Sequence, residues 1–365
     1  MSNGIAIVGG TFGDQPKASS VIDKMYTTIV QAKAIMKLDR VLYWNGGYTE
    51  DLPRLMKELK PYPIVLWFPN VSNDEPKVRD VKAHYPDKCL VISKRNDNNK
   101  YSLAAIVNRA LQLHANLCVE FTQSPSKNLV TGRVLDPLGN VWCDTTSNVE
   151  RLSRMLLWKI KDIVSVERRA TFEVMGDVPS IPDNPEFFEL IRDYANVFHE
   201  LVDPDKEVER FLGNSSFRCD KGFPSFRSED LIFMSRRNIN KSHIDRNGFV
   251  ATRLRDDSTS LYWGESKPSV DTPIQLRLYG AYPNINFMIH SHTYIQDAPF
   301  TAHHYPCGAI QEVAEILEAV PDRYTTLAYV NLIGHGSLVM SQTVEGLKDV
   351  PYIRRPVPEV FWNDE

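Results

Sequence analysis

Between Gly4 and about Gln123, short apolar runs rich in β-branched and aromatic residues alternate with amphipathic stretches. Alternation of this kind is typical of βαβ units, whose strands form a mostly parallel sheet. Runs that are apolar along their whole length indicate strands covered by helices on both faces. We therefore expect an α/β fold whose N-terminal part is a parallel-sheet domain of Rossmann-like or flavodoxin-like type. The five strand-like runs are IAIV, RVLYWN, PIVLWF, KCLVISK and NLCVEFT.

A chain of 365 residues exceeds the usual size of one domain, so we expect two. Residues 175–186, MGDVPSIPDNPE, contain three prolines and several turn-forming residues, and neither helical nor strand periodicity continues through them. The sequence therefore predicts an N-terminal α/β domain of unknown role over residues 1–175 and a second domain over residues 185–365.

The composition excludes several classes of protein. Lysine and arginine are spread along the chain, whose formal net charge is -4, so the basic patch of a nucleic-acid-binding protein is not expected. No apolar run reaches the length of a membrane span, and residues 1–10 lack the pattern of a signal peptide. The cysteines are odd in number and far apart, which indicates neither a disulfide framework nor a CxxC metal site. We expect a soluble, cytoplasmic protein with no nucleic-acid or membrane partner.

A glycine-rich segment, GGTFG at residues 9–13, follows the first strand-like run and precedes a helical pattern. Such a place can hold a phosphate on backbone amides at a helix N-terminus. The segment lacks the spacing of a dinucleotide-binding or P-loop motif, and glycines are also needed for a tight strand-to-helix turn. Both readings stay open, and no function follows from this domain alone.

Three histidines in the final quarter of the chain are candidates for metal ligands. The segment FMIHSHTYI has the character of a strand, so His290 and His292 should point to the same face. His335 lies between two glycines after another apolar run and could supply a third nitrogen. Three protein ligands would leave one coordination position open for a substrate, as in catalytic zinc sites. The alternative is that all three are surface or satisfied core histidines.

Other motifs accompany these histidines: a Gly-Asn pair at residues 213–214, a Pro-Ser-x-Asp-Thr-Pro run that continues to Tyr279, and a Gly after His335. In content and order the C-terminal segments resemble the class II aldolase and adducin-head family. They are most similar to its L-ribulose-5-phosphate 4-epimerase branch. The resemblance covers roughly residues 185–345 and implies a class II aldolase-like α/β/α domain there.

The resemblance implies a role for each matching residue. His290, His292 and His335 would hold a divalent metal ion, most often Zn²⁺ in this family. Asp271 matches the acidic residue beside the metal, where it would act as general base or labile ligand, and Tyr305 is a candidate proton donor. Asp271 also precedes a helical pattern and could be its N-cap, and Tyr305 could be a packed aromatic residue. The positions that match phosphate-binding residues of the family are Asn214, Ser235 and Ser269.

Two features depart from the family. Ser235 is followed by Arg236 and Arg237, where members have a small residue and glycine; an arginine could bind phosphate directly, or the pair could be solvated. After His335, where members continue with a long helix, three prolines precede the end of the chain, so we expect no full-length helix. Both departures concern the reaction more than the metal site.

Three functions are consistent with these residues. The first is a metal-dependent, aldolase-type lyase that acts on a small sugar or sugar phosphate through a metal-stabilised enediolate. The second is a sugar-phosphate 4-epimerase of the same family, which the Asp-Thr-Pro motif favours. The third, from another class, is a non-catalytic module like the adducin heads. The resemblance also implies a homo-oligomer, a tetramer with rotational symmetry.

Overall fold

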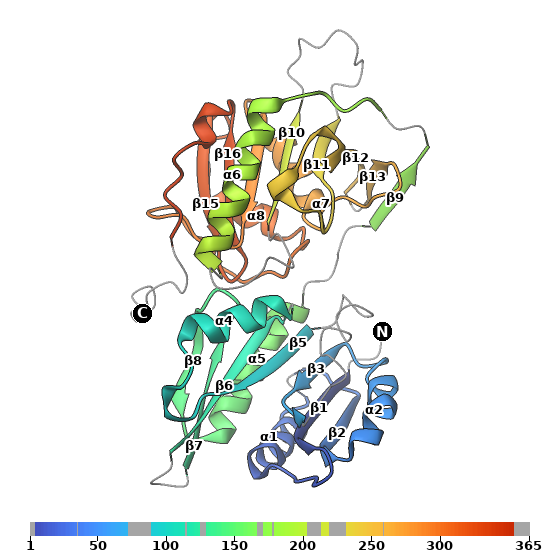
Figure 1. The fold of residues 1–365 in the computed structure, drawn as a ribbon, viewed down its shortest axis with the longest axis vertical. Coiled ribbons are helices and arrows are strands. Elements are labelled where there is room, and N and C mark those ends of the chain that lie inside the picture. The colour runs from blue at the N-terminus through green and yellow to red at the C-terminus, as the bar shows by residue number, and fades with distance from the viewer. Residues whose placement is uncertain are drawn as a thin grey trace. The chain divides into compact units, whose positions relative to one another are not determined.

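The computed structural model describes residues 4–34, 36–71, 89–113, 115–124, 129–165, 171–176, 179–202, 213–218, 231–257 and 259–353 (Figure 1). Its contacts divide the chain into one compact unit that extends to Ser165 and a second over Val166–Val357. Both are α/β units.

The first unit contains a mostly parallel sheet with the strand order β2-β1-β3-β5-β6-β7-β8. β1, β2, β3, β5 and β6 pair in parallel, as expected, and β7 and β8 extend the sheet as an antiparallel hairpin. The parallel part has the order of a flavodoxin-like, doubly wound sheet. The elements are β1 (Gly4–Phe12), α1 (Ser20–Gln31), β2 (Arg40–Gly47), α2 (Leu52–Glu58), β3 (Ile64–Trp67), β4 (Asn70–Val71), β5 (Cys89–Arg95), α4 (Leu103–Gln112), β6 (Leu117–Ser124), β7 (Leu129–Leu135), β8 (Val141–Thr146) and α5 (Val149–Val164).

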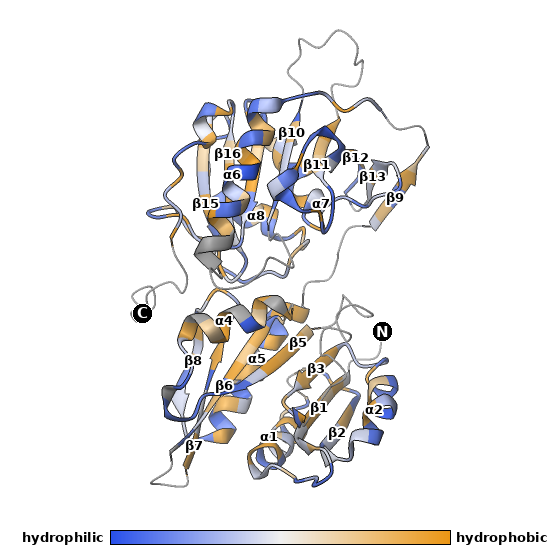
Figure 2. Ribbon diagram, viewed as in Figure 1, coloured by the Kyte–Doolittle hydropathy of each residue, from blue (hydrophilic) through white to orange (hydrophobic). Residues whose placement is uncertain are grey.

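Most strands of this sheet are apolar along their length, as Figure 2 shows by their orange colour. Along β1, Ile5 and Ile7 pack in the core that α1 and α5 share, whereas Ala6 and Val8 pack in the core of α2 and α4. Side chains alternate between the faces of a strand, so a continuously apolar run feeds two cores at once. The uninterrupted hydrophobic runs are therefore explained by helices on both faces.

The glycine-rich segment belongs largely to β1 itself. The strand continues to Phe12, so most of the segment is strand and does not form a turn before α1. The amide of Thr11 donates to the carbonyl of Lys17 at 2.7 Å, and that of Gly13 donates to the carbonyl of Gly47 at 3.1 Å. Amides that are bonded within the protein cannot cradle a phosphate, which favours the purely structural reading.

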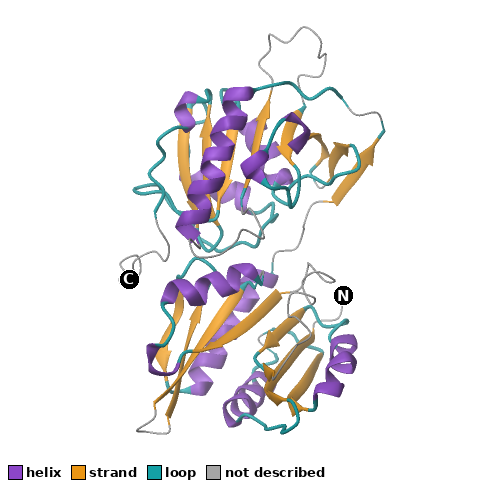
Figure 3. Ribbon diagram, in the orientation of Figure 1, coloured by secondary structure: helices purple, strands orange, loops and turns teal. Residues whose placement is uncertain are grey.

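The second unit contains a mixed sheet with the order β15-β16-β14-β10-β11-β12-β13-β9, in which every neighbouring pair is antiparallel except β13 and β9 (Figure 3). Its elements are β9 (Thr171–Met175), α6 (Pro185–Val202), β10 (Asn214–Arg218), β11 (Ile232–Ser235), β12 (Phe249–Asp256), β13 (Thr259–Trp263), α7 (Thr272–Ala281), β14 (Phe287–Ser291), α8 (Glu312–Ala319), β15 (Leu327–Leu332) and β16 (Gly336–Ser341), with short 3₁₀ turns η3 (Lys241–His243), η4 (Arg246–Gly248) and η5 (Glu345–Leu347).

Helices cover both faces of this sheet as well. Phe187 and Ile191 of α6 pack in a core with Phe217 and Ile289 of the sheet. The opposite face forms a second core with α7 and α8, in which Met288 of β14 is fully buried. The unit is therefore an α/β/α sandwich, as the resemblance implied.

The first described residues after the division belong to the second sheet. β9, which the sequence analysis placed in the N-terminal domain, pairs in parallel with β13 from Thr171 to Met175. The proline-rich segment that suggested the boundary follows this strand. Of the C-terminal segment expected to contain no long helix, residues 342–353 contain only the short turn η5, and residues 354–365 lie outside the described residues.

Cysteines and membrane spans can be checked over the described residues. Cys89, Cys118, Cys143 and Cys307 are free thiols, as expected, and Cys219 lies outside that part of the chain. No helix within it has the length and apolar character needed to cross a membrane.

Candidate metal centre

The three candidate histidines come together where β14 and β16 meet the turn between β15 and β16. β14 lies between β10 and β16, and His290 is paired with Asn214 on one side and Leu338 on the other. His335 is the last residue of the β15–β16 turn. The strand expected over residues 287–295 ends at Ser291, so His292 stands just beyond β14.

The three rings nevertheless converge. The ring centroid of His290 lies 5.0 Å from that of His292 and 4.6 Å from that of His335. The ring centroids of His292 and His335 are 5.9 Å apart. One ring nitrogen from each residue lies within 4.8 Å of the other two. His290 and His335 are buried and His292 is half-buried. The constellation could therefore hold one ion and leave it accessible from one side.

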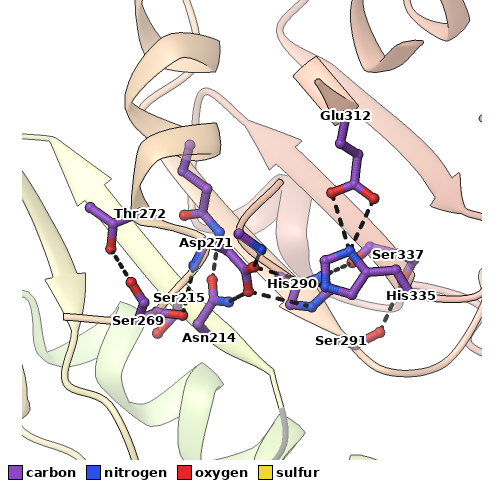
Figure 4. Close-up of polar contacts among 12 residues, drawn as sticks. Asn214, Ser215, Ser269, Asp271, Thr272, His290, Ser291, Glu312, His335 and Ser337 are labelled. Carbon is purple, nitrogen blue, oxygen red and sulfur yellow. Dashed lines mark hydrogen bonds and ion pairs between the residues drawn. The ribbon is translucent and has the colours of Figure 1, made fainter. Parts of the chain in front are cut away.

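Hydrogen bonds fix the two buried rings through their Nδ1 atoms. Nδ1 of His290 donates to the backbone carbonyl of Ser337 at 2.9 Å. Nδ1 of His335 donates to the carboxylate of Glu312, at 3.0 and 3.1 Å from its two oxygens. Metal-binding histidines are usually oriented in this way, with the second nitrogen bonded to a carbonyl or carboxylate. The arrangement leaves Nε2 of each ring available (Figure 4).

Asp271 faces both of these Nε2 atoms. One carboxylate oxygen lies 3.9 Å from Nε2 of His290, and the other lies 3.9 Å from Nε2 of His335. Its two oxygens also accept hydrogen bonds, from Asn214 Nδ2 at 2.8 Å and from the Gly308 amide at 2.7 Å. Asp271 directly precedes α7, but its side chain makes no capping hydrogen bond. The carboxylate therefore faces the two rings and does not cap α7.

The donor atoms fit a divalent cation. Nε2 of His290 and Nε2 of His335 are buried, and neither has a hydrogen-bond partner among the residues that the structure describes. Buried polar atoms are almost always bonded, so two such atoms aimed at one carboxylate need an explanation. Imidazole nitrogens together with a carboxylate oxygen are ligands that a zinc-type cation accepts. The group could hold a metal ion.

Burial governs the charge of the site. It lowers the pKa of His290 to about 4, with a further contribution from His335, so this ring is neutral at pH 7 and its Nε2 can act as a ligand. Burial also raises the pKa of Glu312, while the contact with His335 opposes that effect. For His335, burial disfavours the charged ring, but its contacts with Cys307 and Glu312 outweigh burial and raise its pKa well above the usual range.

A buried chain of polar side chains links Asp271 to α7. Asn214 donates to Asp271 and accepts from Gln275 Nε2 at 2.5 Å. The Ser216 hydroxyl lies 2.5 Å from Gln275 Oε1 and 2.9 Å from the Tyr279 hydroxyl. Asp271, Gln275 and Tyr279 are spaced by four residues and therefore share one side of the helix. The run from Pro268 to Tyr279 thus supplies residues of the hydrogen-bonded chain that supports Asp271. The side chain of Asn214, which the sequence predicts at a phosphate, forms hydrogen bonds within this chain instead.

The other residues expected at the phosphate lie at the end of β11 and before α7. Ser235 is buried, and its hydroxyl accepts from the amide of Ser215 at 3.1 Å. The Ser269 amide donates to the Ser235 carbonyl at 3.2 Å, which joins the two segments. Arg236 is half-buried, and its Nε atom is buried with no partner among the described residues, whereas Arg237 is exposed. Arg237 nevertheless donates from Nε to the Pro268 carbonyl at 3.3 Å, so neither side chain is simply solvated.

Sequence reasoning did not identify Lys241, a buried cation on η3 near the centre. Only 6% of its surface is exposed, and burial lowers its pKa to about 8. It lies close enough to His290 to contribute to the lowered pKa of that ring. The electrostatic surroundings of the histidines therefore include a positive charge within the second unit.

Tyr305 belongs to a neighbouring cluster on the loop before α8. Its hydroxyl donates to Glu315 at 2.9 Å, and the same carboxylate is bonded by the amide and Nδ1 of His303. Burial, together with Glu315, raises the pKa of Tyr305 to about 12. Its hydroxyl therefore keeps its proton at neutral pH, and the hydrogen bond to Glu315 holds it in place.

Gly336, after His335, is required by close packing. Its φ angle is +148°, and an added Cβ would clash with the carbonyl oxygen of Ser291. A side chain would push β16 away from the end of β14 at the point where His290 and His335 meet. A glycine is therefore required after His335 because the backbones of β16 and of Ser291 lie in close contact there.

A family model described as the class II aldolase and adducin N-terminal domain matches residues 192–299. The C-terminal part of the chain thus contains a class II aldolase/adducin domain, as the resemblance predicted. The match includes Asp271, His290 and His292 and ends before His335. It gives no support to the epimerase branch in particular. No curated protein matches the chain.

Several solved structures are similar at low identity. L-fuculose 1-phosphate aldolase is 18% identical, with 47% of this chain and 85% of that chain covered and a TM-score of 0.33. The N-terminal class II aldolase domain of a conserved protein from Thermoplasma acidophilum is 18% identical, with 46% and 86% covered and a TM-score of 0.30. The DNA/pantothenate metabolism flavoprotein from Streptococcus pneumoniae is 13% identical, with 44% and 98% covered and a TM-score of 0.35. Scores this low establish no shared function.

Proposed function

We propose that this chain is a divalent-metal-dependent lyase of the class II aldolase type, which acts on a small sugar or sugar phosphate. The observation that carries the proposal is the pair of buried Nε2 atoms of His290 and His335, which have no partner among the described residues and face the carboxylate of Asp271. A bound cation, which we take to be Zn²⁺, would stabilise the negative charge that develops on the substrate oxygens when the carbon–carbon bond breaks.

The side chains around the centre have distinct tasks in this proposal. His290, His292 and His335 hold the cation, and Glu312 orients His335. Asp271 accepts the proton of the substrate hydroxyl or ligates the cation when no substrate is present. Each of its oxygens already accepts one hydrogen bond, from Asn214 or from the Gly308 amide, so its orientation is fixed before substrate binds.

Tyr305 is our candidate for the proton donor. Its raised pKa, about 12, means that the hydroxyl keeps its proton at pH 7, and its bond to Glu315 fixes its position. A group that donates a proton must be protonated before the step, and Tyr305 meets this condition.

An anionic group on the substrate would be bound beside the centre. The buried Nε of Arg236 offers a donor, and Ser235 and Ser269 lie on the adjoining segments. Arginine binds phosphate with charge-assisted hydrogen bonds, so it can replace the glycine-containing loop of the family. We expect Arg236→Ala to raise KM for a phosphorylated substrate at least about tenfold, the loss of one such bond, and Arg237→Ala to leave KM unchanged. Equal KM values in both variants would argue against a phosphate at this place.

Product analysis tests the reaction. A panel of sugar phosphates is incubated with the metal-loaded protein, and aldehyde release is followed with a coupled reductase. Aldehyde formation that is lost in His290→Ala supports the lyase. Inverted stereochemistry without aldehyde would contradict it and favour the 4-epimerase, for which the aspartate at position 271 is the supporting feature. A protein that binds no metal and turns over no substrate would instead be a non-catalytic module.

We also propose that the chain forms a homo-oligomer, by analogy with the tetramers implied by the family resemblance. Sedimentation equilibrium at working concentration tests this point, and a monomeric mass would contradict it.

A further inference from the structure

We propose that Cys307 supplies a thiolate ligand to the cation held by His290, His292 and His335. The inference rests on the proposed metal centre and deepens it, because it changes the expected donor set from nitrogen and oxygen to nitrogen, oxygen and sulfur.

The first support is distance. The sulfur of Cys307, a carboxylate oxygen of Asp271 and a ring nitrogen of His335 all lie within 4.8 Å of one another. In a tetrahedral site, bond lengths of about 2.3 Å from zinc to sulfur and about 2.0 Å to nitrogen place the two donor atoms about 3.5 Å apart. An approach of about 1 Å by the Cys307 sulfur, which one rotamer adjustment can supply, would reach that geometry.

The second support is the loop that holds Cys307 in place. The amide of Gly308, the next residue, donates to Asp271 at 2.7 Å. An added Cβ on Gly308 would lie 2.8 Å from the carbonyl oxygen of Val270, so the loop is in tight contact with the segment that carries Asp271. Cys307 is thereby tied to the same carboxylate that faces His290 and His335.

The third support is independent of the cysteine. His335 is 4% exposed, its Nδ1 is bonded to Glu312, and its Nε2 has no hydrogen-bond partner among the described residues. Cys307 lies beside this ring and contributes to its raised pKa. A cation between sulfur and nitrogen would satisfy both atoms.

A thiolate ligand changes which metal the centre prefers. Soft sulfur donors favour zinc and similar ions, whereas Mg²⁺ and Mn²⁺ prefer oxygen. The structure therefore assigns to Cys307 a part in metal selection, apart from any part in the reaction itself.

Cobalt substitution tests this assignment directly. The full chain is freed of metal, loaded with Co²⁺ and examined by absorption spectroscopy, because thiolate–cobalt bonds give an intense charge-transfer band in the near ultraviolet. We expect the band in the unaltered protein and in Cys143→Ser, a matched change at a buried cysteine of the first unit, and its loss in Cys307→Ser. Binding of Co²⁺ without this band in the unaltered protein would overturn the role of Cys307 and leave the histidine centre intact. No binding of Co²⁺ or Zn²⁺ at all would overturn the proposed function as well.

Competition between metals provides the second readout. The ratio of Zn²⁺ to Mn²⁺ affinity is measured for the unaltered protein and for Cys307→Ser. We expect the preference for zinc to fall at least about tenfold in the variant, since loss of even a supporting group costs about that much. An unchanged ratio would overturn the assignment.

Discussion

Each of the two buried histidines uses one ring nitrogen for a fixed hydrogen bond and directs the other toward Asp271. Glu312 provides that hydrogen bond for His335, and its carboxylate is completely buried. Burying a carboxylate is costly unless it is paired. The buried Glu312 carboxylate therefore fixes the orientation of the His335 ring.

Replacement of this carboxylate is predicted to weaken metal binding without removing a ligand. Glu312→Gln keeps the shape and an oxygen acceptor for Nδ1 of His335 but removes the negative charge that makes the ring a better donor. We expect metal affinity, measured by competition with a chelator, to fall about 10- to 100-fold. Glu318→Gln, at an exposed position of the same helix, is the control and should change nothing. Equal affinities in the two variants would contradict the orienting role.

For single residues, the sequence identified the histidines and Asp271 as candidates but did not identify the residues that hold them in place. The His-x-His spacing and the family-like motifs pointed to His290 and Asp271, which the fold brings together. Nothing in the spacing indicates that Glu312, the first residue of a short helix, is buried against a ring 23 positions later. Gln275 offered a weak signal, since it is a polar residue four positions after Asp271 and lies between the apolar residues Ile274 and Leu276.

Among the elements, the junction of β14 and β16 determines whether the site can form. Gly336 allows β16 to approach the end of β14, and both strands bring a ligand candidate to that junction.

Two glycine substitutions are predicted to act in opposite directions. Gly336→Ala forces a Cβ against Ser291 at a backbone conformation that favours glycine, and we expect a loss of more than about 2 kcal/mol of stability and of metal binding. Gly280→Ala, in α7 with open space around the added carbon, should raise stability by about 0.5–1 kcal/mol. Chemical denaturation of both variants checks the pair. If Gly336→Ala left the stability unchanged, the junction of β14 and β16 would tolerate a side chain, and the prediction would be wrong.

Element type was predictable wherever periodicity was strong. The helical spacing of Leu152, Leu156 and Ile160 predicts a helix, observed as α5 (Val149–Val164) with the Asn148 side chain as its cap. The segment GRVLDPLGNVWCD, residues 132–144, predicts a hairpin, observed as β7 and β8. Strand ends were not predictable, because β1 continues through its glycines and β14 stops before His292. Those limits depend on pairing with neighbouring strands, which local sequence does not encode.

For the molecule as a whole, the chain consists of two compact units, each with its own cores. The chain length predicted two domains, the alternating strand and helix patterns predicted an α/β fold for the first, and the family resemblance implied one for the second. The proline-rich segment was a natural place for a boundary, but β9, which precedes it, pairs in the second sheet, and only pairing across a long separation reveals this.

Separate cores predict separable effects of mutation. Leu156 of α5 is fully buried in the first unit, so Leu156→Ala should cost that unit about 2–5 kcal/mol. The metal content of the protein should be unchanged, because no candidate ligand lies in that unit. Met155→Ala, at a neighbouring position with 41% exposure, is the control and should affect neither property. Loss of metal together with the first unit's stability would show that the two units fold as one.

The central claim is that His290 and His335 hold a metal ion, and elemental analysis of purified protein tests it most directly. The measurement compares the unaltered chain with His290→Ala, His335→Ala and the control His243→Ala, which changes an exposed histidine on η3. We predict about one divalent ion per chain in the unaltered protein and the control, and loss of most of it in the other two. Unchanged metal content in both His290→Ala and His335→Ala would contradict the account.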